Sequence, residues 1–81
     1  MRDILIYTTN TCAYCVMVKR YLQSKGLTWT EINLDEQPEK QQEAFQISGQ
    51  LAVPVTLVTD KNDNKNVVIG YNLAKLASAL A

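Results

Sequence analysis

The sequence predicts an α/β fold, a mixed four-stranded sheet with helices on both faces, in a single domain over residues 1–81. Strand-like and helix-like segments follow one another in the order β-α-β-α-β-β-α. The βαβ portion requires parallel strands joined by a right-handed crossover. The polar turn between the last two strand segments predicts a hairpin, so these strands are expected to be antiparallel.

The first strand is expected over residues 2–7, because its continuous apolar run suits a strand covered on both faces. After a polar loop, a helix is expected over residues 13–25, with Thr11 or Cys12 as its N-cap. Its inward stripe is formed by side chains at helical spacing: Cys15, Val18 and Leu22. The next strand is expected over residues 27–34, which are rich in β-branched side chains.

The second half of the chain is expected to hold a helix over residues 38–47, strands over residues 53–58 and 67–69, and a helix over residues 73–80. Pro38 begins the first of these helices and Gly49 stops it, whereas Asn72 caps the last one. The apolar contacts of the two helices are expected from Ala44, Phe45 and Ile47, and from Leu73, Leu76, Ala77 and Leu80.

The charge and the cysteine content of the chain exclude several classes of function and favour others. Eight basic and eight acidic residues cancel, which disfavours nucleic acid and anionic membranes as partners. Only four apolar residues follow the first three, too few for a secretory signal, and no apolar run approaches membrane-spanning length. Two cysteines in such a chain predict cytoplasmic thiols, whose disulfides are usually transient and catalytic. With no histidine, histidine metal sites and Cys–His nucleophile pairs are excluded.

The main chemical signal is Cys12-Ala13-Tyr14-Cys15, which contains both cysteines of the chain. At the first turn of a helix, unpaired backbone N–H groups point at the Cys12 sulfur and favour its thiolate. Cys15 lies one turn later on the same side, close enough to form a disulfide with Cys12. A Cys-x-x-Cys that follows a strand and opens a helix predicts thiol–disulfide exchange.

Three short segments resemble the glutaredoxins, which have the thioredoxin fold: Ile6-Tyr7-Thr8, Cys12-Ala13-Tyr14-Cys15 and Ala52-Val53-Pro54. The resemblance covers nearly the whole chain and is greatest to the short glutaredoxin-like and NrdH-redoxin group. It implies a small oxidoreductase that serves electron transport and cell redox homeostasis by reducing protein or glutathione mixed disulfides. Partners of this kind would be ribonucleotide reductase or a peroxidase, and the chain would act as a monomer without a bound cofactor.

The same resemblance implies individual roles. Cys12 would be the attacking thiol and Cys15 the resolving thiol. Pro54 would be the family's cis-proline, which puts the Val53 backbone beside Cys12, where it pairs with an extended peptide or with glutathione. Substrate contacts would also come from Tyr14, Gly70, Tyr71 and Asn72. A solvent-facing Tyr14 and a helix-capping Tyr71 are the alternatives.

The sequence departs from the family pattern in three places. Ala13 replaces the usual proline, no lysine precedes the motif, and Gly70 is not followed by an acidic pair. The last two departures remove polar anchors for the charged termini of glutathione. They favour a thioredoxin reductase over glutathione as the reductant.

Other functions and simpler interpretations stand beside this prediction. An iron–sulfur cluster shared by two chains, with glutathione as extra ligand, is the alternative function, because Ala13 frees a backbone N–H that proline lacks. Buried structural thiols are the plain alternative for the cysteines, and zinc would need ligands from outside the chain. Lys19 and Arg20 are expected on a solvated helix face, and Asp35 and Glu36 as charges at a helix N-terminus.

Overall fold

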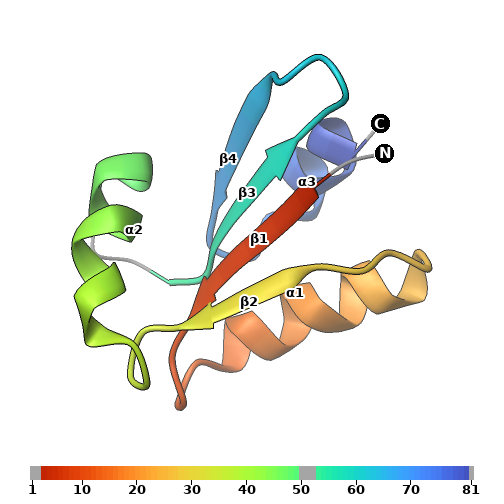
Figure 1. The fold of residues 1–81 in the computed structure, drawn as a ribbon. Helices are drawn as coiled ribbons and strands as arrows, with labels where there is room; N and C mark the ends of the chain where they lie inside the picture. The colour runs from red at the N-terminus through yellow and green to blue at the C-terminus, as the bar shows by residue number, and fades with distance from the viewer. Residues whose placement is uncertain (1–2, 50–52, 81) are drawn as a thin grey trace.

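The computed structural model describes residues 3–49 and 53–80, and it confirms the predicted element order (Figure 1). The strands are β1 (Asp3–Thr8), β2 (Thr30–Asn33), β3 (Val55–Thr59) and β4 (Lys65–Ile69). The helices are α1 (Ala13–Ser24), α2 (Gln41–Ser48) and α3 (Leu73–Leu80), and α2 is preceded by a short 3₁₀ turn, η1 (Pro38–Lys40). Of the predicted first strand, Arg2 lies outside the described residues. Within the described ranges, no helix is long and apolar enough to cross a membrane.

The four strands form one mixed sheet in the order β2-β1-β3-β4. β1 is parallel to β2 and antiparallel to β3, and β3 pairs with β4 as the predicted hairpin. In this register Ile6 lies between Glu31 of β2 and Thr56 of β3. The central strand β1 therefore carries its last residues, and the loop that follows, to the edge of the sheet where α1 begins.

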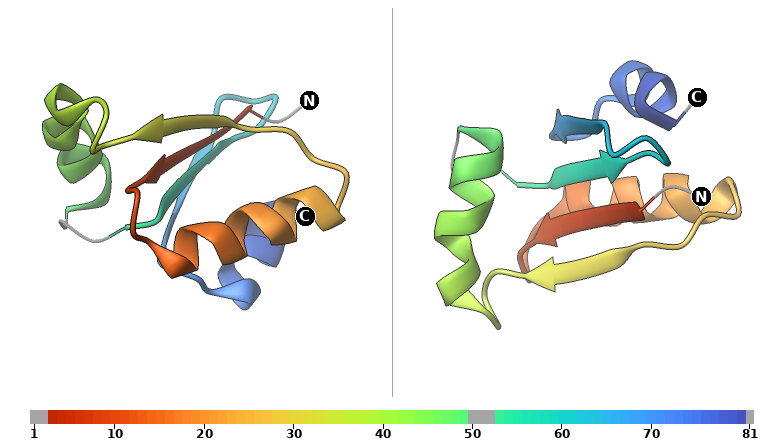
Figure 2. Two further views of the ribbon diagram at one scale, coloured as in Figure 1. Left: turned by 90° about the horizontal axis from the view of Figure 1, so that it is seen from below. Right: turned by 45° about the horizontal axis from the view of Figure 1, so that its top comes forward.

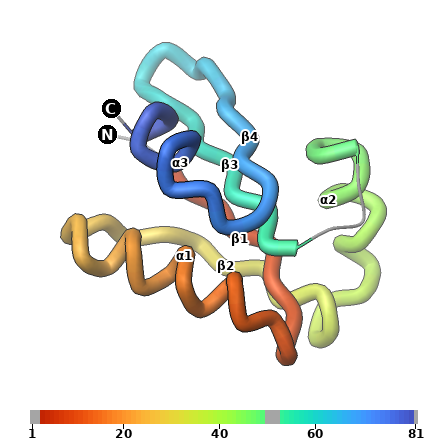
Figure 3. The backbone as a smooth tube through the Cα atoms, turned by 180° about the vertical axis from the view of Figure 1, so that it is seen from behind, coloured from red at the N-terminus to blue at the C-terminus, as the bar shows by residue number. Residues whose placement is uncertain are grey.

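Helices cover both faces of the sheet, with α1 and α3 on one side and α2 on the other (Figures 2 and 3). Alternate side chains of β1 supply both cores, because successive residues of a strand point to opposite faces. On the α1 and α3 side the buried cluster is Ile4, Ile6, Val18, Leu22, Val68 and Leu76. On the α2 side it is Tyr7, Leu34, Ala44 and Val55. The predicted α1 stripe of Cys15, Val18 and Leu22 is fully buried.

β2 is shorter than the expected strand over residues 27–34. It is an edge strand that pairs only with β1, and this ladder begins where Leu5 meets Thr30. Residues 27–29 stay outside the sheet, and the Leu27 N–H donates instead to the Leu22 carbonyl in the last turn of α1, at 3.1 Å. Leu27 and Trp29 pack instead against the core below α1 and α3.

The apolar contacts expected for α2 and α3 are partly wrong. Phe45 is 46% exposed, because it follows the buried Ala44 by about 100° around a short helix and so lies off its inward stripe. On α3 only Leu76 is fully buried, whereas Leu73 and Ala77 are exposed. The ends are as expected, since Gly49 stops α2 with a left-handed φ of 73° and Asn72 caps α3.

Candidate active site

The two cysteines form a disulfide at the amino end of α1, with their Cα atoms 5.3 Å apart. Cys12 is the N-cap residue, in an extended conformation, and its sulfur accepts a hydrogen bond of 3.1 Å from the backbone N–H of Cys15. Cys12 is half-buried, whereas Cys15 is only 1% exposed. A partner can therefore reach Cys12 from solvent, whereas Cys15 is shielded from solvent.

The helix start contains no group that opposes a negative charge on Cys12. No acidic side chain lies in the first turn of α1. The first N–H groups of the helix have no intrahelical acceptor and point toward the cap residue. Reduction of the disulfide would thus leave the Cys12 sulfur in a field that favours its thiolate.

A second segment that sequence analysis singled out lies at Pro54 and Gly70. The Val53–Pro54 peptide bond is cis, as predicted. The Gly70 N–H donates a 2.8 Å hydrogen bond to the Pro54 carbonyl, which brings the turn before α3 against the start of β3. The Asn72 side chain accepts from the Lys75 N–H and caps α3, while the half-buried Tyr71 packs against the core below α1 and α3.

Three apolar side chains near the start of α1 are exposed to solvent. Tyr14 is 60% exposed, Val16 45% and Met17 40%. All three lie within the first turns of the helix that begins at the disulfide. Exposed apolar groups gathered beside a reactive centre are typical of surfaces that meet another protein.

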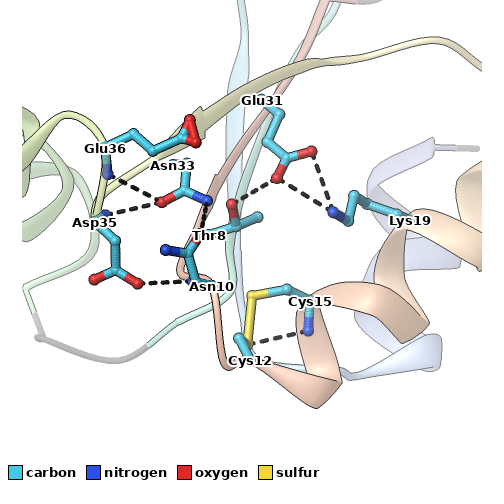
Figure 4. A network of polar contacts seen from close by, with 9 residues as sticks. All are labelled: Thr8, Asn10, Cys12, Cys15, Lys19, Glu31, Asn33, Asp35 and Glu36. Atoms are coloured by element: carbon cyan, nitrogen blue, oxygen red, sulfur yellow. Dashed lines mark hydrogen bonds and ion pairs between the residues drawn. A yellow bond between two sulfur atoms is a disulfide. The ribbon is translucent and has the colours of Figure 1, made fainter.

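A polar network behind the disulfide connects the central strand β1 and the edge strand β2 to α1 (Figure 4). The buried Thr8 hydroxyl donates a 2.7 Å hydrogen bond to Glu31 on β2. Lys19, one turn after Cys15 on α1, forms an ion pair of 3.2 Å with the same carboxylate. Lys19 is partly exposed, in keeping with its predicted place on a solvated helix face, and β2 in addition brings a carboxylate within its reach.

The hydrogen bond from Thr8, together with Lys19, holds the pKa of Glu31 below its ordinary value. A carboxyl with a lowered pKa contributes stability above its unfolded-state pKa, and the contribution is lost as the pH falls through the folded-state value. The Glu31→Gln variant is expected to lose about 1 kcal/mol of unfolding free energy at neutral pH, since its side chain still accepts from Thr8 but lacks the charge. Denaturant midpoints should show this difference shrink as the pH falls below about 4. An equal difference at neutral and strongly acid pH would contradict it.

A second polar cluster holds the loop that leads to Cys12. Asn10 donates its backbone N–H to the Asp35 carboxylate at 2.7 Å, and its side-chain oxygen accepts from the Asn33 amide at 2.8 Å. The other end of the Asn33 side chain accepts from the N–H groups of Asp35 and Glu36. Asp35 was expected as a helix N-terminal charge. Instead, its carboxylate accepts a hydrogen bond from the Asn10 backbone N–H, in the loop that leads to Cys12.

Tyr7 anchors α2 to the same end of β1. Its hydroxyl donates a 2.6 Å hydrogen bond to Glu43 on α2, and the ring is fully buried. Burial, followed by the neighbouring Glu43 carboxylate, raises the pKa of the Tyr7 hydroxyl above its ordinary value. Tyr7 is therefore a neutral hydrogen-bond donor at physiological pH, and its role is to hold α2 in place.

Sequence reasoning missed the polar residues that support the site: Thr8, Asn10, Lys19, Glu31, Asn33 and Asp35. No local pattern marks their contacts with β1, α1 and the loop before Cys12, because these contacts join residues far apart in the sequence. The available signal was indirect. Glu31 and Asn33 are two residues apart in an expected strand, so their side chains share one face of the sheet.

The side chains of the described residues were considered next as possible metal ligands. Within residues 3–49 and 53–80, no group of three or more histidine, cysteine, aspartate or glutamate side chains is placed to hold a metal ion. The two cysteines alone would supply half of a four-ligand site. A cluster would therefore need ligands from a second chain or from glutathione.

Comparison with known proteins adds the family. The Glutaredoxin family profile matches residues 4–62. A glutaredoxin-like 8.6 kDa protein from the rubredoxin operon of Clostridium pasteurianum is 33% identical over 73 residues, which cover 90% of this chain and 91% of that protein. Glutaredoxin 3 of Escherichia coli is 39% identical over 54 residues, which cover 67% of this chain and 65% of that protein.

The fold leads to the same family. The NrdH-redoxin of Escherichia coli, described as a glutaredoxin-like protein with a thioredoxin-like activity profile, superposes with a TM-score of 0.76 at 29% identity, over 94% of this chain and 92% of that one. The sheet order, the flanking helices and the redox disulfide at the start of α1 agree with this likeness. The chain thus belongs to the glutaredoxin family and is a thiol–disulfide oxidoreductase of the thioredoxin fold.

Proposed function

We propose that the chain is a dithiol electron donor to protein disulfides, with Cys12 as the attacking thiol and Cys15 as the resolving thiol. The observation that supports this order is the unequal burial of the two sulfurs at the start of α1. An incoming disulfide meets the half-buried Cys12 first. Cys15, at 1% exposure, needs only to reach the sulfur of its neighbour one turn away.

In the proposed reaction, the Cys12 thiolate attacks one sulfur of the substrate disulfide, and the other sulfur leaves as a thiolate. The product is a mixed disulfide between Cys12 and the substrate. The Cys15 thiolate then attacks the Cys12 sulfur, releases the second substrate thiolate and closes the Cys12–Cys15 bond. Two electrons pass from the two cysteines to the substrate, and an external reductant restores the pair.

The exposed apolar residues Tyr14, Val16 and Met17 support a protein as the substrate. Together they offer a surface beside Cys12 on which an apolar segment of a partner can lie. Enzymes that form a disulfide during turnover, such as a ribonucleotide reductase or a peroxidase of the cytoplasm, fit this requirement. An extended stretch of the partner would bind along Val53 and Pro54, near the turn formed by Gly70, Tyr71 and Asn72.

As reductant we propose a flavin-dependent thioredoxin reductase in preference to glutathione. Glutathione carries charged termini that need charged partners. The loop from Thr8 to Thr11 contains no cation, and Lys19, the first cation along α1, is already paired with Glu31. The thioredoxin-like activity profile described for the NrdH-redoxin of Escherichia coli supports the same choice.

The test is to reduce the oxidised protein with NADPH and thioredoxin reductase, or with NADPH, glutathione and glutathione reductase, at matched concentrations. Consumption of NADPH in the presence of a protein disulfide substrate measures turnover. We expect faster turnover with thioredoxin reductase. Faster turnover with glutathione would contradict the proposed reductant, and no turnover with either system would contradict the proposed function.

A further inference from the structure

The loop between β1 and α1 is held at its midpoint by a side chain from the edge strand. Asn33 is the last residue of β2, and its amide donates to the Asn10 side chain at 2.8 Å. Asn10 lies two residues before Cys12. The Asn33 oxygen is itself fixed, because it accepts from the backbone N–H groups of Asp35 and Glu36 at 2.9 and 3.2 Å.

A second hydrogen bond holds the same residue of the loop. The Asn10 backbone N–H donates to Asp35 at 2.7 Å, so the loop is tied through both its backbone and its side chain. Further back, the Leu34 N–H donates to the Thr8 carbonyl at 2.8 Å and continues the pairing of β1 with the chain after β2. Between Asn10 and the start of α1 at Ala13 there remain only Thr11 and Cys12.

We propose that Asn33 is a positioning residue for Cys12. By holding Asn10, it keeps the loop in the conformation that places the Cys12 sulfur at the amino end of α1, in line with the unpaired N–H groups. The inference rests on the proposed role of Cys12 as the attacking thiol. It assigns Asn33 no contact with the substrate.

The physical reason is that the field of a helix end acts over a short range. Its stabilisation of a negative charge falls off within the first turn and depends on alignment with the N–H groups. The extended conformation of Cys12, with φ of –99° and ψ of 104°, is what brings its sulfur to the cap position. A loop released from Asn33 would populate other conformations, and the time-averaged stabilisation of the thiolate would fall.

The experiment measures the pKa of the Cys12 thiol from the pH dependence of alkylation, in protein that carries Cys15→Ser so that one thiol reports. In Asn33→Ala we expect the pKa to rise by about half a unit, so that alkylation at a pH well below both pKa values slows about threefold. Asn10→Ala, which removes the acceptor, should raise the pKa in the same direction. Because the Asn33–Asn10 hydrogen bond is lost in both variants, and Asn33→Ala also removes the bonds to Asp35 and Glu36, the double variant should match Asn33→Ala.

Asn64→Ala is the matched control. Asn64 is another asparagine whose side chain forms a hydrogen bond, here to the Asp60 carboxylate, which its backbone N–H bonds as well, but it lies in the β3–β4 turn at the opposite end of the sheet (Figure 1). It should leave the Cys12 pKa unchanged, although it costs some stability. An unchanged pKa in folded Asn33→Ala protein would overturn the positioning role alone. A parent pKa at the free-thiol value of about 8.5 would overturn the proposed role of Cys12 and, with it, this inference.

Discussion

Replacing Cys12 with serine is expected to abolish disulfide reduction, whereas replacing Cys15 with serine is expected to stop the reaction at a mixed disulfide. Without the Cys12 sulfur there is no accessible nucleophile, because Cys15 is 1% exposed behind it. Without the Cys15 sulfur the first exchange still occurs, but nothing inside the chain displaces the substrate from Cys12. The two variants therefore fail at different steps.

Mass spectrometry after treatment with a small-molecule disulfide distinguishes the two variants. Cys15→Ser should gain one adduct on Cys12, and Cys12→Ser should gain little on its buried thiol. Ala13→Ser is a suitable control, because it adds a hydroxyl at an exposed position between the cysteines and keeps both sulfurs. An adduct on Cys15 in the Cys12→Ser protein, with none on Cys12 in the other variant, would reverse the assigned order.

Much of the fold follows from local patterns in the sequence. The α1 stripe of Cys15, Val18 and Leu22 is buried as its spacing predicts, because a helix with one apolar face has one way to lie on a sheet. Gly49 and Asn72 mark helix ends through their own backbone and side-chain chemistry. These features depend on residues within a few positions of each other, so the sequence contains all that determines them.

The misjudged elements depend on neighbours that the sequence does not identify. β2 begins only at Thr30, although residues 27–29 have β-forming side chains, and the Leu27 N–H bonds the end of α1 instead of a strand. Phe45 looks like a core residue by type, but a short helix that buries Ala44 leaves the adjacent position exposed. Burial was set by register and by helix length, which local propensity does not encode.

The site shows the same division. The cysteines and Pro54 are recognised by type and spacing. Glu31 and Asn33, which bond α1 and the loop before Cys12, lie on β2 and are not. Glu31 and Asn33 lie two residues apart on that strand. Glu31 contacts Lys19 on α1, and Asn33 contacts Asn10 in the loop before Cys12. The edge strand thus links the fold to the chemistry, because its register with β1 decides which polar groups stand beside the disulfide.

Glutathione-dependent turnover is expected to rise when charged anchors are introduced into this site. Thr9→Lys is the suitable place for a cation before the motif, because Thr8 is buried against Glu31 and Asn10 is held by Asn33. Asn72→Asp introduces a carboxylate after Gly70 and keeps a side chain that caps α3 well. Each charge-assisted hydrogen bond contributes about 1.5–3 kcal/mol, which corresponds to roughly tenfold or more in affinity.

We therefore expect each variant to raise the rate at limiting glutathione about tenfold, and the pair together on the order of a hundredfold, since the two sites are separate. The rate with thioredoxin reductase should change much less. Thr28→Lys and Asn62→Asp are matched controls, because they introduce the same charges at exposed positions away from the disulfide. If the parent protein already turns over efficiently at low millimolar glutathione and the added anchors change nothing, the missing charges do not determine the reductant, and the chain uses glutathione as its reductant.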